Sequence, residues 1–314
     1  MQPVAVVFCF NEGFCPVAAA AVGSLIAHTG AGRHYDLYIV SPDLSAGSRE
    51  QLSAMTCGHD VTLQVVDFDL QAHCRHDFDY SRHTRHTFIR LFLPQILGHL
   101  PRVLYLDSDL VILEDVASLY DHELQGHAVG VVADPLTTTP SEFATLLGQV
   151  GLPRTTIAEY LTRYLGLPSG AQAGYFNTGV MLLDLPRFAG HLEHRLEELL
   201  DRRYVFSDQD LLNIVFAEDK ELLEGQWNVQ VKASGAPPAA DARILHYIGK
   251  CKPCDDVHPV TAPTLPYWQA IAATPFYAAA LERYAAARAR AAIAGMLQHG
   301  AALRQALAAA GRRS

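Results

Sequence analysis

The stretch Arg102-Val103-Leu104-Tyr105-Leu106-Asp107-Ser108-Asp109-Leu110-Val111 decides the fold of this chain. Its apolar first half predicts a short strand that is covered on both faces of a sheet. Asp107 and Asp109 follow one residue apart, so a bend here can turn both carboxylates toward one point. Two hard oxygen ligands at a strand's carboxyl end suit Mg²⁺ or Mn²⁺, and open α/β sheets bind ligands at this edge. The alternative is a turn with two solvated carboxylates, because a bare Asp-x-Asp pattern is common.

The segments before this strand alternate between strand-like and helix-like patterns. Strands are predicted at 4–10, 36–41 and 61–68, with helices at 15–28 and 45–55. This β-α-β-α-β order predicts a parallel sheet of the nucleotide-binding type. The turn Asn11-Glu12-Gly13-Phe14 after the first strand has no G-x-G-x-x-G pattern, which argues against a dinucleotide pyrophosphate site there.

The segments after the carboxylates continue the alternation. We expect a short helix at 114–120, a strand at 127–134, a polar helical insertion at 137–168, a loop and strand at 174–185, an amphipathic helix at 186–203, a helix at 211–216 and a last strand from 243. Ser207 is expected to cap the helix at 211–216, with Asp208 and Asp210 in its first turn. The insertion is interpreted as a lid or a substrate-binding element.

Bulk composition is typical of a soluble globular protein. The chain has 314 residues, of which 50% are hydrophobic and 18% charged, and its net charge of −9 argues against nucleic-acid binding. No charged segment precedes the first strand, and the longest apolar run is too short to span a membrane. The six cysteines suggest no disulfide framework, so a reduced cytoplasmic protein is expected.

Two polar features lie between the third strand and the carboxylates. Residues 71–86 contain four histidines, and their spacing favours a loop near a site over a standard metal cluster; they are His73, His76, His83 and His86. Arg90 lies on an otherwise apolar helix expected at 87–97. A lone Arg in this position either pairs with a core carboxylate or reaches a ligand phosphate.

Four motifs follow one another along the chain. They are Tyr-Leu-Asp-Ser-Asp at 105–109, Tyr-Phe-Asn-Thr-Gly-Val-Met-Leu-Leu-Asp-Leu at 175–185, Ser-Asp-Gln-Asp-Leu-Leu-Asn at 207–213 and Leu-His-Tyr-Ile-Gly-Lys-Cys-Lys-Pro at 245–253. Together they resemble glycosyltransferase family 8, over roughly residues 4–270. The resemblance implies one α/β GT-A domain with a mainly parallel central sheet flanked by helices, a UDP-hexose donor, Mn²⁺ and retention at the anomeric carbon. Galactose or glucose is the expected hexose, and a saccharide or glycolipid, such as lipopolysaccharide, is the expected acceptor.

The resemblance also assigns the donor site. Asp107, Asp109 and His246 resemble the metal ligands of the family, and this set suits Mn²⁺ better than Mg²⁺, the alternative ion. Lys252 and the backbone of Gly249 resemble the phosphate contacts. The expected donor-binding set is Phe8, Asn11, Phe14, Arg90, Asp107, Ser108, Asp109, His246, Gly249 and Lys252.

The expected catalytic residues are Asp208, Gln209 and Asn177. Asp208 resembles the residue that holds hydroxyls of the donor sugar, and Asn177 corresponds to a residue beside the sugar. Gln209 corresponds to the residue nearest the β face of the anomeric carbon. A primary amide is a poor nucleophile, yet it can stabilise an oxocarbenium-like state, so front-face attack is favoured over a covalent glycosyl-enzyme. Asp210 is expected either to support Gln209 or to cap the helix.

One motif departs from the family pattern. The family usually has Asp-Asp or similar after the first strand, gripping uracil and ribose, whereas this chain has Asn11-Glu12. The Asn11 carbonyl can accept a hydrogen bond from uracil N3–H, so base recognition can survive the change. Cys251 and Cys254 form a C-x-x-C pair without a second pair at zinc spacing. Cys254 is interpreted as standing where the family often has Trp.

The chain is expected to divide into a GT-A domain at 1–275 and a helical tail at 276–314. After Tyr277 there are six Arg and one Glu, so the tail carries about +5 and the rest about −14. Such a cationic amphipathic helix can lie on an anionic membrane surface, here the inner face of the cell membrane. A helix packed on the domain and a disordered end are the alternatives.

Two other functions fit parts of the sequence. Residues 107–111 also match the D-x-D-x-V nucleophile loop of haloacid-dehalogenase-type phosphatases, although that loop normally follows the first strand and no convincing downstream acidic pair is found. A non-catalytic nucleotide-sugar-binding protein is the other alternative. The intact set of Asp107, Asp109, His246 and Lys252 argues against it.

Overall fold

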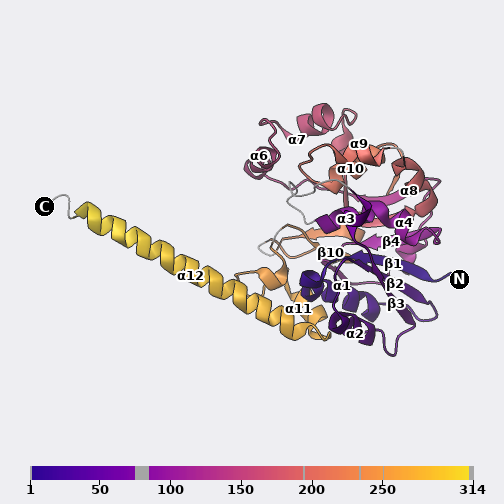
Figure 1. The fold of residues 1–314 in the computed structure, drawn as a ribbon, viewed down its shortest axis with the longest axis horizontal. Coiled ribbons are helices and arrows are strands. Elements are labelled where there is room, and N and C mark those ends of the chain that lie inside the picture. Colours follow the sequence, from indigo (N-terminus) through magenta and orange to yellow (C-terminus); the bar gives the residue numbers. More distant parts are fainter. Residues whose placement is uncertain (1, 75–84, 194, 233–234, 250, 311–314) are drawn as a thin grey trace.

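The computed structural model of the chain describes residues 2–74, 85–193, 195–232, 235–249 and 251–310. Figure 1 shows a sheet covered by helices, with one long helix leading away from it. The central sheet has seven strands in the order β3-β2-β1-β4-β7-β6-β8. Their bounds are β1 (Val4–Cys9), β2 (Tyr35–Ser41), β3 (Val61–Asp67), β4 (Arg102–Leu106), β6 (Val129–Ala133), β7 (Phe176–Asp184) and β8 (Lys220–Leu222).

The direction of the strands confirms the predicted fold class. Strands β3, β2, β1 and β4 are parallel, as the alternating pattern requires. They are connected through helices that include α1 (Cys15–Ala27) and α2 (Ala46–Ala54). Strand β7 runs antiparallel to both β4 and β6, while β8 is parallel to β6. The sheet is therefore mainly parallel, with β7 as the reversed strand between β4 and β6.

The stretch around the two carboxylates divides between two sheets. Strand β4 ends at Leu106, and the chain resumes after Asp109 as β5 (Leu110–Ile112), which belongs to a second sheet of order β5-β10-β9. Strand β10 (Ile244–Tyr247) is antiparallel to β5, and β9 (Val229–Val231) is parallel to β10. The register pairs His246 with Leu110. A strand that comes more than a hundred residues later is thus brought beside the carboxylate turn.

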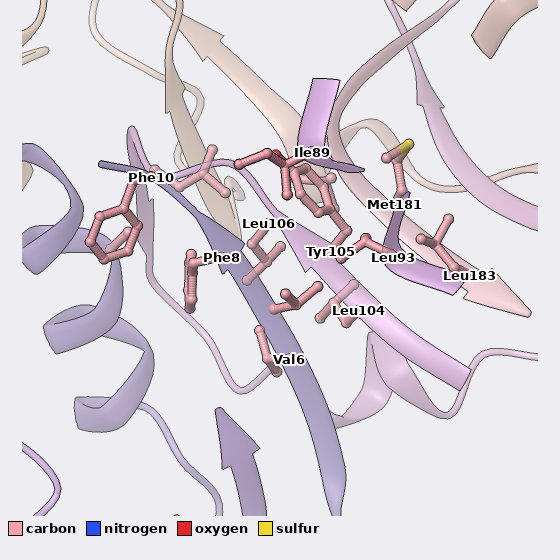
Figure 2. Packing of buried hydrophobic residues seen from close by; sticks show 14 of the residues in the cluster. Val6, Phe8, Phe10, Ile89, Leu93, Leu104, Tyr105, Leu106, Met181 and Leu183 are labelled. Atoms are coloured by element: carbon pink, nitrogen blue, oxygen red, sulfur yellow. The ribbon is translucent and has the colours of Figure 1, made fainter. Parts of the chain in front are cut away.

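Buried apolar side chains pack around β1 and β4, the strand that leads to the carboxylate turn (Figure 2). Phe8 on β1 pairs with Leu106, the last residue of β4 before Asp107. Both side chains are fully buried, as are Ile89 and Leu93. The Phe8 side chain therefore packs in the core beside β4, and the expected contact of Phe8 with the donor stays a prediction.

The helices follow the sequence pattern with local differences. The helix expected at 87–97 is a 3₁₀ segment (Arg85–Phe92) followed by α4 (Leu93–Leu97), because Pro94 permits a new helix start there. The helix expected at 186–203 is two shorter helices, α8 (Leu185–Leu192) and α9 (Leu196–Leu200). Among the described residues, the remaining α-helices are α3 (Leu70–His73), α5 (Ala117–Tyr120), α6 (Pro140–Gln149), α7 (Ile157–Glu159), α10 (Asp208–Val215), α11 (Leu265–Ala272) and α12 (Tyr277–Ala310). His76 and His83 of the histidine-rich segment lie outside the described residues.

The insertion at 137–168 is helical, as predicted. Helices α6 and α7 both begin with capping boxes, formed by Thr139 with Glu142 and by Thr156 with Glu159. The expected cap at Ser207 is wrong in its detail. Helix α10 begins at Asp208, and Ser207 precedes it at φ 56° without a side-chain capping hydrogen bond.

The tail divides into a docked root and a projecting part. Arg283 forms an ion pair with Asp255 and donates to the Gly13 carbonyl oxygen, and Ala280 and Ala287 are buried. Beyond this root, α12 leads away from the sheet (Figure 1). The described residues contain no helix with both the length and the apolar character needed to cross a bilayer. All six cysteines are free, with Cys254 buried and Cys251 exposed.

Candidate active site

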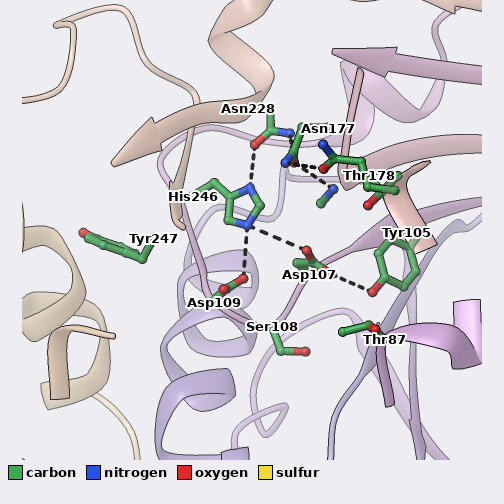
Figure 3. A network of polar contacts seen from close by, with 12 residues as sticks. Thr87, Tyr105, Asp107, Ser108, Asp109, Asn177, Thr178, Asn228, His246 and Tyr247 are labelled. Atoms are coloured by element: carbon green, nitrogen blue, oxygen red, sulfur yellow. Dashed lines mark hydrogen bonds and ion pairs between the residues drawn. The ribbon is translucent and has the colours of Figure 1, made fainter. Parts of the chain in front are cut away.

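The two carboxylates and the predicted histidine meet at the carboxyl end of β4 (Figure 3). His246 Nε2 lies 3.3 Å from Asp109 Oδ1 and 3.7 Å from Asp107 Oδ2. One ligand atom from each residue lies within 4.8 Å of the other two, and among the described residues this is the group of His, Cys, Asp and Glu with such geometry. The pairing of β10 with β5 creates this arrangement, since it sets His246 across from Leu110, beside Asp109.

Lys252 lies directly on this group. Its Nζ is 2.5 Å from Asp109 Oδ2 and 2.8 Å from the Tyr247 carbonyl oxygen. Burial acts to raise the pKa of the Asp109 carboxyl, but Lys252 and then His246 outweigh it and hold the pKa well below its usual range. Asp109 is therefore a carboxylate at neutral pH.

Arg90 is the buried cation that holds the other carboxylate. It is 3% exposed, and its Nη2 lies 2.8 Å from Asp107 Oδ1 while its Nε lies 3.1 Å from Asp208 Oδ2. The Tyr105 ring faces the guanidinium, and the Tyr105 hydroxyl donates to Asp107 Oδ1 over 2.7 Å. Of the two interpretations that the sequence allowed, the structure shows the pairing with core carboxylates. Arg90 thereby joins the carboxylate turn to the start of α10.

Gln209 is held at both ends of its amide. Its Oε1 accepts from Asn177 Nδ2 over 3.0 Å, and its Nε2 donates to Asp134 Oδ2 over 3.0 Å. Asn177 in turn accepts from Asn228, whose Oδ1 lies 2.9 Å from His246 Nδ1. The three expected catalytic residues are thus grouped, with Asp208 adjoining Gln209 at the start of α10.

Asp134 and Asn228 were not predicted as site residues. Asp134 directly follows β6 and Asn228 directly precedes β9, so each is a polar residue at a strand end. That position was the available signal, but neither lies in a motif whose chemistry points to a ligand. Their importance follows from contacts that only the folded chain makes.

Asp210 does not support Gln209 directly. Its carboxylate accepts from the Tyr160 and Tyr175 hydroxyls over 2.6 and 2.7 Å and from the Phe206 N–H over 2.8 Å. Tyr160 belongs to the insertion, so Asp210 connects that insertion to α10. Burial raises the pKa of Asp210 from 3.8 to about 6, although these hydrogen bonds act in the opposite direction.

This shift predicts a pH-dependent stability. A carboxyl group with a raised pKa in the folded state contributes stability that is fully present below about pH 4 and lost as pH rises through about 6. As the pH rises from about 4 to about 6, the unfolding free energy of the wild-type chain should therefore fall by about 3 kcal/mol relative to that of Asp210→Asn. Urea unfolding at several pH values measures the difference. Asp256→Asn, at another buried aspartate, controls for the substitution, and equal slopes for wild type and Asp210→Asn would contradict the assignment.

The remaining expected donor residues lie in three segments near the triad of Asp107, Asp109 and His246 in sequence or along the sheet: the carboxylate turn, the turn after β1 and the loop after β10. Ser108 is buried and donates to the Cys9 carbonyl oxygen over 3.3 Å. Asn11 and Phe14 are half-buried at the ends of the turn after β1. Glu12 in that turn accepts hydrogen bonds from Ser45 and so anchors the start of α2. Gly249 has φ 85°, a conformation that favours glycine in the loop leading to Lys252.

A cavity of about 540 Å³ adjoins the site. Its wall includes Asn228, which bonds to Asn177 and His246, and Ile248, two residues after His246. The other lining residues come from the end of β6, from β9 and from the segment 235–239, and most are apolar or proline. The cavity therefore offers a largely apolar wall next to a polar, charged centre.

Comparison with known proteins bears on the identity of this site. The sequence profile of glycosyl transferase family 8 matches residues 5–257. The chain belongs to glycosyltransferase family 8. This membership confirms the resemblance that the four motifs indicated, and it sets aside the phosphohydrolase alternative.

Several curated proteins and solved structures are similar over much of the chain. General stress protein A of Bacillus subtilis is 22% identical over 72% of this chain and 73% of its own length. The bifunctional glycosyltransferase WbbM aligns with a TM-score of 0.72 and 22% identity over 90% of this chain and 52% of its own. The galactosyltransferase LgtC, solved with donor and acceptor sugar analogues, aligns with a TM-score of 0.65 and 17% identity over 87% of this chain and 96% of its own. These structures confirm the GT-A fold, and the chain spans less than half the length of several other curated relatives.

Proposed function

We propose that this glycosyltransferase moves a hexose, galactose or glucose, from a UDP-sugar to a saccharide acceptor with retention of anomeric configuration. The observation that carries the proposal is the meeting of Asp107, Asp109 and His246 at the carboxyl end of β4, with Lys252 beside them. In a family 8 chain, this arrangement is suited to a divalent cation and the diphosphate of the donor.

The side chains around the triad fit a cation of the Mn²⁺ type. Asp109 is ionised, and two carboxylates with one imidazole are a mixed oxygen and nitrogen donor set that Mn²⁺ accepts. When bound, the ion supplies Lewis-acid neutralisation of charge on the departing diphosphate. Lys252 adds a positive charge at the same place, and Arg90 keeps Asp107 oriented from beneath.

The amide of Gln209 is proposed to act on the sugar. Its carbonyl oxygen carries the negative end of the amide dipole, which can stabilise positive charge as it develops at the anomeric carbon. Asn177 and Asp134 hold both ends of this amide and so limit its rotation. Because an amide is a poor nucleophile, we favour attack by the acceptor from the side of the leaving group. Asp208 is proposed to hold hydroxyls of the donor sugar.

The cavity beside Asn228 is the proposed location of the acceptor. Its apolar wall can contact the hydrophobic face of a sugar ring or the lipid-proximal part of a glycolipid, while the polar centre holds the reacting hydroxyl. A lipopolysaccharide or another cell-surface glycan meets this description.

A donor screen tests the proposal. The chain is incubated with UDP-glucose, UDP-galactose or their N-acetylated forms, with Mn²⁺ or with a chelator, and UDP release is measured with and without saccharide acceptors. We expect Mn²⁺-dependent release, slow without acceptor, and transfer products that NMR shows to keep the donor's anomeric configuration. UDP binding without turnover of any donor would instead support a binding protein, and inversion would contradict the retaining mechanism.

The projecting part of α12 is proposed to contact anionic membrane lipid at the inner face of the cell membrane. Ile293, Met296 and Leu297 are 58%, 73% and 66% exposed at helical spacing, on a helix that also carries Arg288 and Arg290. Exposed apolar residues with flanking cations favour interfacial binding.

Replacing these three apolar residues together by Glu should abolish sedimentation of the chain with vesicles of anionic phospholipid. The change removes the apolar area that would enter the membrane, and it adds negative charge on the same face of the helix. The donor hydrolysis rate in solution serves as the control and should stay unchanged, because this part of α12 lies away from the site. Equal sedimentation of variant and wild type would contradict the membrane assignment.

A further inference from the structure

An unbroken chain of side-chain hydrogen bonds connects the imidazole of the triad to the catalytic amide. It runs from His246 Nδ1 to Asn228 (2.9 Å), from Asn228 to Asn177 (2.8 Å), and from Asn177 to Gln209 (3.0 Å). It ends where Gln209 donates to Asp134 over 3.0 Å. Figure 3 shows Asn228 beside the His246 ring and Asn177 next to Asn228.

The direction of every bond in this chain is determined by two groups that cannot reverse. The Gly179 N–H can only donate, and it lies 2.9 Å from Asn177, so the atom facing it is the Asn177 carbonyl oxygen. At the far end, the carboxylate of Asp134 accepts, so Gln209 turns its NH₂ group there and its oxygen toward Asn177. Both ends give the same orientation for the Asn177 amide.

The orientation of Asn228 and the protonation of the imidazole follow from this. Asn228 faces the Asn177 oxygen and therefore presents its NH₂ group there, which leaves its own oxygen toward His246. Because that oxygen only accepts, His246 Nδ1 must carry the proton. When the ring is neutral, its lone pair is then on Nε2, the nitrogen that lies toward Asp107 and Asp109, and this is the tautomer that a metal ligand needs.

We propose that Asn228 is a positioning residue that fixes the Nδ1–H tautomer of His246 for cation binding and links that ligand, through Asn177, to Gln209. The inference rests on the proposed function, since it assigns a partner to the cation site. Asn228 is 5% exposed and its side chain makes these two hydrogen bonds, so its amide lies between the ligand and the catalytic group. An outer partner that fixes a histidine ligand commonly changes metal affinity about 10–100-fold when it is removed.

The backbone of Gly179 on β7 also restricts the position of the His246 ring. A Cβ added at Gly179 would lie 2.3 Å from His246 Cε1 and 2.7 Å from Nδ1. The ring therefore packs against the β7 backbone with no room to move toward that strand. The same residue's carbonyl oxygen accepts from the Asp107 N–H over 2.7 Å, so Gly179 fixes both the imidazole and the carboxylate turn.

The test compares three variants of the full chain by their affinity for Mn²⁺, measured from the electron paramagnetic resonance signal of the free ion. Asn228→Ala removes both hydrogen bonds, and we expect Mn²⁺ binding weaker by about 10–100-fold. Asn228→Asp keeps an acceptor for His246 Nδ1–H but loses the donor to Asn177. It should bind Mn²⁺ within a few-fold of wild type and still turn over the donor more slowly at saturating Mn²⁺.

The control is Asn213→Ala, which removes a buried asparagine whose side chain bonds to the backbones of Phe176 and Gln209 and takes part in none of the side-chain bonds between His246 and Asp134. It should lower the unfolding temperature without changing Mn²⁺ affinity. Wild-type affinity in Asn228→Ala would overturn the inference while leaving the proposed function intact. Equal weakening in Asn228→Ala and Asn213→Ala would reduce Asn228 to a structural role and also overturn it. Failure of the wild-type chain to bind Mn²⁺ would overturn this inference and the cation site together.

Discussion

Asp109→Ala should lower the rate of UDP release from a UDP-hexose by at least about 10³-fold, because it removes a ligand of the cation that neutralises the departing diphosphate. The substitution also removes the carboxylate that pairs with Lys252, so the Lys252 ammonium loses the ion pair that holds it beside the cation site. Mn²⁺ affinity, measured by isothermal titration, should fall with the rate. Donor hydrolysis with added Mn²⁺ measures the kinetic effect directly.

The control for this prediction is Asp67→Ala. Asp67 is the last residue of β3 in the same sheet, where it pairs with Arg49 and is far more exposed than Asp109. It tests whether the loss of any strand-end carboxylate affects turnover, and it should leave both Mn²⁺ affinity and rate near wild type. Circular dichroism of Asp109→Ala should show a folded chain. An active Asp109→Ala variant with unchanged Mn²⁺ dependence would contradict the assigned cation site.

The sequence was sufficient for the part of the site that consists of short motifs. Asp107 and Asp109 could be located because a buried apolar strand ends in two acids, and the order of the four motifs supported the metal interpretation over a solvated turn. His246 followed from the resemblance to family 8. The parallel strands β1 to β4 also followed from the alternating pattern, since the crossover helices between them have their own periodicity. In each case the informative residues are close together in the sequence.

The features that the sequence did not reveal depend on pairing between distant segments. Nothing in residues 176–184 distinguishes an antiparallel strand from a parallel one, so the reversed direction of β7 became visible only in the sheet. The separation of β4 and β5 into two sheets was also not predictable, because it depends on the pairing of β10 with Leu110–Ile112. Asn228 and Asp134 belong to this class too, since an asparagine or aspartate at a strand end is ordinary until its partners are known.

Arg90 shows why residue type alone left two interpretations open. A lone Arg on an apolar helix can reach a phosphate or a carboxylate with equal ease. Folding decides between them by placing Asp107 and Asp208 on either side of the guanidinium and leaving it 3% exposed. Arg90 thus contacts two carboxylates of the site, and the donor-side contact expected from the resemblance stays a prediction.

Gln209→Ala should lower kcat by about 10²–10³-fold, as does the loss of a preorganised dipole that stabilises charge in a transition state. Unlike Asp109→Ala, it leaves Asp107, Asp109 and His246 in place, so Mn²⁺ affinity and UDP binding should stay within a few-fold of wild type. The KM for the donor should change much less than kcat, because the amide is proposed to act on the positive charge that appears during the reaction. Steady-state kinetics at saturating Mn²⁺ separates the two constants.

Two further variants make this prediction decisive. Gln226→Ala removes a half-buried glutamine whose side chain bonds to Asp241, and it should leave kcat unchanged. Gln209→Glu places a carboxylate where the amide now donates to Asp134 over 3.0 Å, so two like charges would face each other and the side chain should be displaced. A slow Gln209→Glu variant without covalently bound sugar in its mass spectrum agrees with front-face attack. Accumulation of a glycosyl-enzyme at position 209 would instead show that this position is placed to act as a nucleophile, and it would overturn the role assigned to the Gln209 dipole.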